Sequence, residues 1–471
     1  MKLKKFEFTS TFEKIMADTL TPVSVYLKLR DHFPGSILLE SSDYHTNDNS
    51  FSYICCKPMA SISLHNETLT KTLPDQSEEV ITLSESNTLI EEIDGFSKQF
   101  KGERLPFKFI TNGWFGYTSY DSVRYFENLP DYKTDKPGQD IPDIYYALYQ
   151  NIIAIDHFKN EAYLICHSYN DSAPNIEEIK ALLAVESLST YPYKNLGDKQ
   201  ANISDESFKD LVVKAKEHCK RGDVFQLVLS RQTSQAFQGD EFNVYRALRS
   251  VNPSPYLFYF DYINFKLFGS SPEAQLIVQE GQAEIHPIAG TYKRTGDDEK
   301  DAELAKKLAA DPKENAEHVM LVDLARNDLS RNGHAVEVKT YREVQFFSHV
   351  IHLVSKVTAK KTEGTSTLQL MADTFPAGTL SGAPKPMALK LIDKYESTRR
   401  GFYGGAIGFF DFDGNYNHAI LIRSFLSKNN KLYYQAGAGI VASSDEESEL
   451  QETYNKLGAL QKALELAENL R

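Results

Sequence analysis

Short apolar runs separated by polar segments predict several strands in the first third of the chain. The runs lie at 36–40, 51–56, 145–155 and 161–167, and the second contains the adjacent cysteines Cys55 and Cys56. The polar segment DHFKN separates the last two runs and predicts a hairpin. Residues 107–118 hold the single Trp and two glycines, which is typical of a turn between strands.

Later segments alternate between helical and strand-like patterns. Residues 204–220 predict a helix capped by Ser204 and ended by Gly222, with an apolar stripe on one face. In the strand expected at 224–231, alternation places Gln226, Val228 and Ser230 on one face. Further helices are expected at 298–309, at 367–373 and at 446–469, together with one that begins at 311 and one that ends at 395. Further strands are expected at 257–260, 265–268, 283–288, 336–338, 346–357 and 432–439. Residues 404–426 predict a hairpin.

The pattern also suggests a division of the chain. Residues 1–170 read as one α+β unit, and 171–203 begin helical and then become polar and irregular. We therefore expect an N-terminal α+β domain at 1–170, a linker at 171–203 and a second domain at 204–471.

Composition excludes several classes of protein. The chain has 471 residues, 41% of them hydrophobic and 25% charged, as in ordinary globular proteins. A net charge of −13 argues against binding to duplex nucleic acid. No run of about 18 apolar residues predicts a membrane span, and the N-terminus lacks the apolar core of a signal peptide. Four Cys without metal-site spacing suggest reduced thiols in a cytoplasmic protein.

Two pairs of glutamates stand out on the expected helices. Glu314 and Glu317 lie three residues apart in a helix opened by Asp311 and Pro312, and Glu449 and Glu452 repeat that spacing near the C-terminus. Four carboxylates on two helices can bracket a divalent cation, and oxygen-only ligands suit Mg²⁺. The alternative is two solvated helix faces.

Small residues cluster at the ends of expected strands. The runs are PIAGTYKR (287–294), DTFPAGTLSGAPK (373–385), YGGAIGFF (403–410) and QAGAGIV (435–441). Such runs let backbone N–H groups approach an anion, although many are simply turns. A carboxylate can be bound by Tyr403 and by Arg423, which is expected on a strand. Glu273, at a strand end, can donate a proton if its pKa is raised, whereas His352 within an apolar strand is either catalytic or a satisfied core residue.

Taken together, these motifs resemble the chorismate-utilising enzymes, and among them most closely the anthranilate synthase component I group. SPEA, PIAGTYKRTG, ENAEHVMLVDLARNDLSR, HLVS, GTLSGAPK, YGGAIGF, IRSF, QAGAGIVASS and ELQETYNK occur in this order from 271 to 456. The resemblance implies an α+β fold in which layered antiparallel sheets form a β-sandwich core with helices packed outside and the active site in a cleft between the sheets.

The resemblance also implies roles for individual residues. Mg²⁺ would hold the ring carboxylate of chorismate through Glu317 and Glu452 directly, and through Glu314 and Glu449 by way of water. Glu273 would be the general acid for the departing 4-hydroxyl, Thr379 would contact the ring side, and His352 would support the elimination of pyruvate. The substrate carboxylates would be bound by Gly290, Thr291, Tyr403, Arg423, Gly437, Ala438 and Gly439.

Two positions distinguish the branches of this family. Enzymes that add water carry a lysine base where this chain has Gln226, and aminodeoxychorismate synthases carry a lysine where it has Ala289. Since ammonia needs no base to act as a nucleophile, we expect ammonia to add at C2 and anthranilate to be the product. The alternatives are an aminodeoxychorismate synthase and a non-catalytic regulatory subunit.

The resemblance further implies an inhibitor site and a partner. LLES (38–41) and NPSPYLF (252–258) match the tryptophan feedback site of the family, with Glu40, Ser41, Pro255, Tyr256 and Leu257 as candidate contacts. The sequence contains no cysteine in the strained turn that a glutamine amidotransferase uses. We therefore expect a hetero-oligomer in which a separate glutaminase subunit (anthranilate synthase component II) supplies ammonia.

Overall fold

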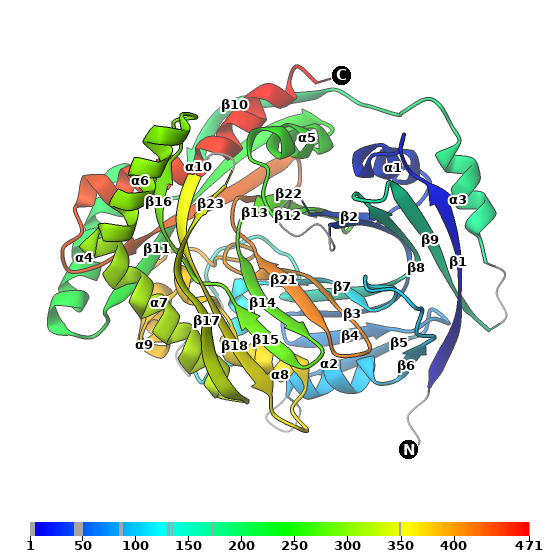
Figure 1. The fold of residues 1–471 in the computed structure, drawn as a ribbon, viewed down its shortest axis with the longest axis horizontal. Helices are drawn as coiled ribbons and strands as arrows, with labels where there is room; N and C mark the ends of the chain where they lie inside the picture. Colours follow the sequence, from blue (N-terminus) through cyan, green and yellow to red (C-terminus); the bar gives the residue numbers. More distant parts are fainter. Residues whose placement is uncertain are drawn as a thin grey trace.

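The computed structural model describes residues 5–41, 50–83, 88–129, 132–133, 135–170, 174–347 and 350–470, with only the backbone of Thr291. Its architecture is α+β, as the sequence predicts: antiparallel strands form the centre of the molecule and helices lie around its rim (Figure 1). The described chain begins just before β1 and ends just after α10 (Figure 1).

Two long strands, β3 (Phe51–His65) and β8 (Ile144–Asp156), pair in antiparallel fashion at the centre, and two arms extend from them. The first arm continues from β3 in the hydrogen-bonded order β2 (Ile37–Glu40), β12 (Tyr256–Asp261), β13 (Lys266–Ser271), β22 (Ser424–Lys428), β23 (Lys431–Ile440), β11 (Gln226–Gly239) and β10 (Tyr193–Ala201). The second continues from β8 through β7 (Trp114–Thr118), β20 (Ala406–Phe410), β21 (Tyr416–Ile420), β14 (Ala274–Gln279), β15 (Gln282–Ile285) and β18 (Val350–Lys361).

The remaining strands extend these ladders. β18 also pairs with β16 (Ile288–Lys293) and β17 (Gly333–Phe346), and β11 with the short β19 (Gly382–Ala383). On the N-terminal side, β8 pairs with β9 (Glu161–Tyr169), β9 with β1 (Phe6–Met16) and β1 in parallel with β6 (Phe100–Gly102), while β3 carries β4 (Thr68–Thr72) and β5 (Glu78–Thr82).

The two arms pack against each other through a shared apolar core. Ile37, Phe258 and Leu426 of the first arm lie in the same buried cluster as Phe115 and Ile407 of the second. Separate clusters join the other sheet surfaces to helices. This is the layered arrangement that the resemblance implies. The far ends of the two arms face each other.

The helices cover the outer surfaces of this core. They are α1 (Pro22–Leu29), α2 (Leu89–Ser97), α3 (Ile176–Leu183), α4 (Asp205–Arg221), α5 (Phe242–Val251), α6 (Asp298–Ala310), α7 (Pro312–Ser330), α8 (Thr367–Thr374), α9 (Lys385–Tyr395) and α10 (Glu446–Ala467), with short 3₁₀ turns η1 (Tyr120–Tyr125) and η2 (Gly378–Leu380). Within the described ranges, no helix is both long and apolar enough to cross a membrane.

The local signals for two helices are confirmed in detail. The Ser204 side chain accepts a hydrogen bond from the Ser207 N–H at the start of α4, and Gly222 ends that helix in the left-handed conformation. Asp311 caps α7 by accepting from the N–H groups of Lys313 and Glu314. The cap matters for the site because it sets where the first pair of glutamates begins.

Two expectations are wrong. Residues 193–201, within the predicted linker, form β10, because β11 is longer than its apolar run suggests and has an open edge there. Arg423 does not lie on a strand: its φ is 51°, in the left-handed region, where the chain turns before β22. The domain boundary remains a prediction, and hydrogen-bonded pairs such as β2–β12 and β7–β20 cross it.

Candidate active site

The predicted catalytic residues meet where the ends of the two arms face each other. Gln226 and Gly439 come from β11 and β23 of the first arm, and Gly290 and His352 from β16 and β18 of the second. Helices α7 and α10 bring in the glutamates. Segments far apart in the sequence therefore form one site.

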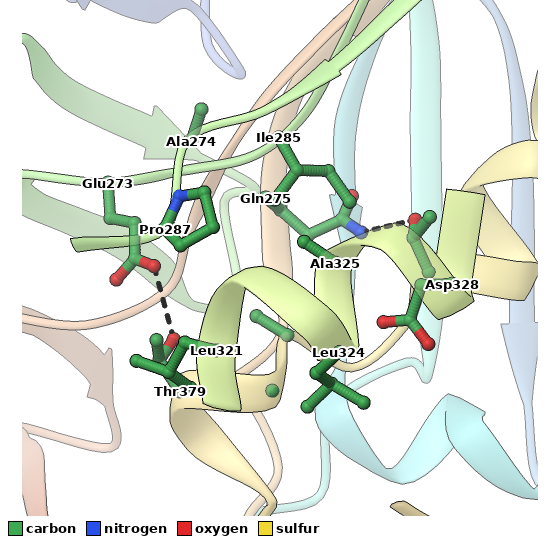
Figure 2. A pocket seen from close by; sticks show the side chains of 13 residues that line it. Glu273, Ala274, Gln275, Ile285, Pro287, Leu321, Leu324, Ala325, Asp328 and Thr379 are labelled. Carbon is green, nitrogen blue, oxygen red and sulfur yellow. Dashed lines mark hydrogen bonds between the residues drawn. The ribbon is translucent and has the colours of Figure 1, made fainter. Parts of the chain in front are cut away.

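Glu273 lies between β13 and β14 and carries a protonated carboxyl group at neutral pH. Burial raises its pKa to about 8, against the opposing effects of the Thr379 hydroxyl and the charges of Lys456 and Arg423. The Thr379 Oγ1 donates to Glu273 Oε1 at 3.2 Å, and Figure 2 shows the two groups facing each other. A carboxylic acid in this state can donate a proton.

A small cavity of about 30 Å³ lies behind Glu273, with room for about one water molecule. It is bordered by Leu321, Leu324 and Ala325 on α7 and by Pro287 (Figure 2). These apolar walls keep bulk water from the carboxyl group, which is the physical cause of its raised pKa.

His352 is held as a neutral imidazole in one tautomer. Its Nδ1 lies 2.8 Å from the carbonyl oxygen of Gly290, and since a carbonyl only accepts, Nδ1 carries the proton. Burial lowers its pKa, and the charge of Arg423 lowers it further. Nε2 is then the basic nitrogen. The catalytic role of His352 remains a prediction.

Gly290 is required by its surroundings. Its φ is +68°, and a Cβ there would lie 2.7 Å from Leu308 Cδ1 and 3.1 Å from Glu314 Oε2. The Thr291 backbone pairs with His352, but its side chain lies outside the described part of the chain, so the prediction for that side chain stays open.

Arg423 brings a positive charge into this site. Its guanidinium has no hydrogen-bond or ion-pair partner among the described residues, and burial lowers its pKa while nearby Tyr403, Glu452 and Glu273 oppose this. Tyr403 is buried, and burial raises its pKa to about 12. A guanidinium beside a neutral phenol is suited to bind a carboxylate.

In the segment 437–439 on β23, Gly437 and Gly439 lie on the side of the strand that faces the site. A Cβ on Gly437 would lie 3.1 Å from the Tyr403 hydroxyl oxygen, and one on Gly439 would lie 2.5 Å from Gln226 Nε2. The Ala438 side chain packs in the core on the opposite face, so only its backbone is available to a ligand.

The four predicted metal carboxylates gather at the end of the site nearest α7 and α10. Burial raises the pKa of Glu314, and the charges of Glu317 and Glu452 raise it further; burial and the charge of Glu452 likewise raise that of Glu449. The four are not drawn together around one point: within the described ranges, no three acidic, imidazole or thiol side chains form a ready-made metal cluster. Glu317 accepts from Gln226 at 2.9 Å, and Glu452 pairs with Lys456 at 2.5 Å.

Lys456 is a site residue that the sequence interpretation missed. It also donates to the Gly437 carbonyl at 2.8 Å and lowers the pKa of both Glu273 and Glu449. Its position four residues after Glu452 on α10 was the available signal, because that spacing places both on one helix face.

Arg400, which the sequence analysis also did not predict, holds together segments that carry the site. Its buried guanidinium forms two hydrogen bonds of 2.7 and 2.8 Å with Glu396 and donates to the carbonyls of Leu380 (2.6 Å) and Val228 (2.8 Å). It also stacks 4.5 Å from the Tyr120 ring. Since Leu380 follows Thr379, Arg400 ties the Thr379 turn to β11.

Replacing Arg400 by methionine is expected to destabilise the fold by about 3–5 kcal/mol, because it leaves the buried Glu396 charge unpaired. Urea unfolding would measure this loss. Adding Glu396→Gln to the variant should recover part of the stability, since the amide still accepts from Ser230 but carries no charge. A double variant less stable than the single one would contradict this explanation.

All five residues predicted for the inhibitor border a second cavity. It has a volume of about 270 Å³ and lies between the layers, bordered by Glu40, Ser41, Pro255, Tyr256 and Leu257 on one side and by residues of β20 and β21 on the other. The Glu40 carboxylate is already engaged on α5, where it accepts from the Tyr245 hydroxyl at 2.6 Å and from Arg249 Nε at 3.0 Å.

The layered α+β fold brings together a buried acid, a neutral imidazole and a guanidinium that has no partner among the described residues, a combination suited to acid–base chemistry on a small carboxylate substrate. The family model for chorismate binding enzymes matches residues 36–462. The chain belongs to this family, and it is an enzyme that acts on chorismate.

Individual relatives refine this placement. The chain is 37% identical to anthranilate synthase component 1 of Aquifex aeolicus over 97% of this chain and 94% of that protein, and 37% identical to that of Acetivibrio thermocellus over 99% and 97%. The crystal structure of anthranilate synthase component I from Streptococcus pneumoniae superimposes with a TM-score of 0.76 at 31% identity, covering 95% of this chain and 99% of that one. The menaquinone-specific isochorismate synthase MenF of Escherichia coli shares the fold, with a TM-score of 0.74 at 18% identity over 98% and 95%.

Proposed function

We propose that the chain is the large subunit of anthranilate synthase, a lyase that converts chorismate and ammonia to anthranilate and pyruvate through 2-amino-2-deoxyisochorismate, the first committed step of tryptophan biosynthesis. The observation that carries the proposal is Glu273, a buried carboxylic acid with a pKa of about 8 that is bonded to Thr379 and lies close enough to Arg423 to be influenced by its charge, as His352 does. The full-length similarity to anthranilate synthase component 1 proteins supports the same reaction.

In the first step, Glu273 donates its proton to the 4-hydroxyl of chorismate. The C4–O bond breaks, the hydroxyl leaves as water, and both ring double bonds shift by one position as the ammonia lone pair forms the new bond at C2. The added nitrogen then gives up its extra proton, which restores the acid form of Glu273. Arg423 and Tyr403 bind a substrate carboxylate, and Thr379 keeps the Glu273 carboxyl group oriented toward the ring side.

In the second step, His352 acts as the base. With its Nδ1–H fixed on the Gly290 carbonyl, the Nε2 lone pair takes the proton from C2. The C3–O bond then breaks, the enolpyruvyl group leaves with the electron pair and becomes pyruvate, and the ring becomes aromatic. A neutral imidazole is required, which agrees with the lowered pKa of His352.

The carboxylates on α7 and α10 fit Mg²⁺. They offer oxygen ligands only, burial and then the charges of neighbouring glutamates raise the pKa of Glu314 and Glu449, and Glu449 Oε2 is buried without a hydrogen-bond partner among the described residues. Glu317 and Glu452 would bind the ion directly, and Glu314 and Glu449 through water. The bound ion would neutralise the ring carboxylate and make the ring a better electron acceptor.

The identity of the nucleophile follows from two positions whose side chains are not basic. Gln226 is a buried neutral amide, and Ala289 is a buried residue on β16. With no lysine at either position, neither activation of water nor attack on the ring by a lysine is supported, and free ammonia is the remaining nucleophile. Ala289 therefore disfavours the aminodeoxychorismate synthase alternative.

The ammonia would come from a glutaminase subunit. Burial raises the pKa of all four thiols, of Cys55, Cys56, Cys166 and Cys219, so none is a reactive thiolate. The chain cannot then release ammonia from glutamine itself, and we propose a hetero-oligomer with a component II partner. Four free thiols also agree with a cytoplasmic location.

Tryptophan would inhibit by occupying the cavity of about 270 Å³ between the layers. Because the Glu40 carboxylate is bonded to α5, backbone carbonyls at the cavity wall are the better acceptors for the α-amino group. Ala419 on β21 borders the cavity and pairs with Ala274, and the Ile420 N–H donates to the Glu273 carbonyl at 3.0 Å. Movement of β21 would therefore displace the catalytic acid.

Replacing Ser41 by leucine is expected to abolish the stabilisation of the protein by tryptophan, because the larger side chain fills the cavity. The unfolding temperature should rise with tryptophan for the unsubstituted protein and for Ser187→Leu, a matched change at an exposed position, but not for Ser41→Leu. An equal rise in all three proteins would place tryptophan elsewhere.

The proposed reaction is tested by anthranilate fluorescence from purified protein, chorismate, Mg²⁺ and ammonium sulfate at about pH 8.5, where more free ammonia is present. Fluorescence that depends on Mg²⁺ would support anthranilate synthase. Isochorismate or aminodeoxychorismate as the product would instead show that Gln226 or Ala289 does not decide the nucleophile. Absence of any chorismate turnover would favour a regulatory subunit.

A further inference from the structure

Gln226 makes a contact that is not explained by the absence of a lysine base at this position. It is the first residue of β11 and its side chain is 2% exposed. Its Nε2 donates to Oε1 of Glu317 at 2.9 Å, which links the first arm of the sheet directly to α7. A buried amide with this geometry fixes the rotamer of the carboxylate it contacts.

The surroundings of Gln226 leave its amide little freedom. Its backbone pairs with Ala383 on β19, and a Cβ on Gly382 would lie 2.2 Å from the Gln226 carbonyl oxygen. On the side-chain end, a Cβ on Gly439 would lie only 2.5 Å from Nε2. Both glycines thus make room for Gln226, and the amide is held in one position against Glu317.

We infer that Gln226 is a positioning residue that orients the Glu317 carboxylate for a divalent cation and sets the cation affinity of the four glutamates. The inference rests on the proposed function of these glutamates. The amide hydrogen occupies one lone pair of Oε1 and leaves the other carboxylate oxygen available. Because the amide is neutral, the negative charge that attracts the cation is retained.

Position 226 would therefore control two properties at once. A lysine here would supply a base for water, but its ammonium group would lie next to Glu317 and form an ion pair that competes with the cation. A glutamine orients the same carboxylate without that competition. We expect this chain to bind its cation more tightly with glutamine than with lysine at 226.

Direct cation binding tests this without relying on turnover. Mn²⁺ binding to the purified full-length chain, followed by EPR of free Mn²⁺ in the absence of chorismate, should be about 10–100-fold weaker in Gln226→Met, the range for removal of a group that orients a metal ligand. Gln226→Lys should be weaker still. Gln451→Met, which removes an exposed amide on α10, is the matched control and should bind like the unsubstituted protein.

The outcomes separate this inference from the proposed function. Equal Mn²⁺ affinity in Gln226→Met and the unsubstituted protein, with binding lost in Glu317→Gln, would overturn the positioning role but keep the glutamate site. Unchanged affinity in Glu317→Gln, or no binding by the unsubstituted protein, would overturn both. Circular dichroism of each variant excludes unfolding as the cause of weaker binding.

Discussion

Replacing Glu273 by glutamine is expected to reduce kcat for anthranilate formation by a factor of about 10²–10⁴, the usual contribution of a general acid. Glutamine still accepts the hydrogen bond of Thr379 but has no acidic proton to give to the departing hydroxyl. Chorismate consumption and anthranilate fluorescence, measured together, would show whether the first step is the one that slows.

The pH dependence provides an independent test of the same residue. The pKa of Glu273 is raised to about 8, so its proton-donating form is present below that pH and is lost as the pH rises through it. The rate per free ammonia should therefore fall above about pH 8 in the unsubstituted enzyme. Expressing the rate per free ammonia is necessary because ammonia itself becomes more abundant over this range.

The Glu273→Gln variant should lack this fall at high pH. Glu280→Gln, an exposed change in the turn after β14, is the matched control and should keep the normal rate and profile. If Glu273→Gln retained a rate within a few-fold of normal, or the same fall above pH 8, another group would be the acid.

Replacing Glu317 by glutamine is expected to remove Mg²⁺-dependent turnover, with a loss of at least about 10³-fold. The change removes one negative charge and one anionic oxygen ligand from the proposed cation site, and charge stabilisation by a bound ion is worth several kcal/mol. The fold should be retained, since Glu317 is only half-buried and lies on the surface of α7 that faces the site.

Thermal unfolding distinguishes loss of the cation from loss of structure. Mg²⁺ should raise the unfolding temperature of the unsubstituted protein, as any ligand specific for the folded state does, and should have little effect on Glu317→Gln. Glu303→Gln, the same change on an exposed face of α6, should behave like the unsubstituted protein. Full activity of Glu317→Gln would remove Glu317 from the cation site.

Much of the site could be predicted from the sequence, because its motifs are local. Asp311 and Pro312 cap α7 as expected, and the spacing of its glutamates requires only a helix. The small residues of QAGAGIV predict that other groups approach this backbone closely. In the structure, Tyr403 lies close to Gly437 and Gln226 lies close to Gly439. The five residues predicted for the inhibitor border one cavity, although 38–41 and 252–258 are far apart in the chain.

Other features depend on contacts that no local pattern contains. The φ of Arg423 is set by the turn between β21 and β22, and β10 forms because the edge of β11 offers it a partner. Arg400 lies in ordinary polar sequence, and the spacing of Lys456 from Glu452 signals only their shared helix face. Their partners Val228 and Gly437 belong to distant strands. Secondary-structure periodicity reports neighbours within a few residues, so it cannot show these links.

The sequence by itself determined most of the helices and strands, the family and the kinds of side chain available, because propensity, spacing and motif order are properties of the chain alone. Only the tertiary structure decided how those side chains behave. The pKa of Glu273 depends on the apolar walls around it, the tautomer of His352 on the Gly290 carbonyl, and the orientation of Glu317 on Gln226. Burial and hydrogen bonding at a site arise from segments that meet only when the arms of the sheet fold against each other.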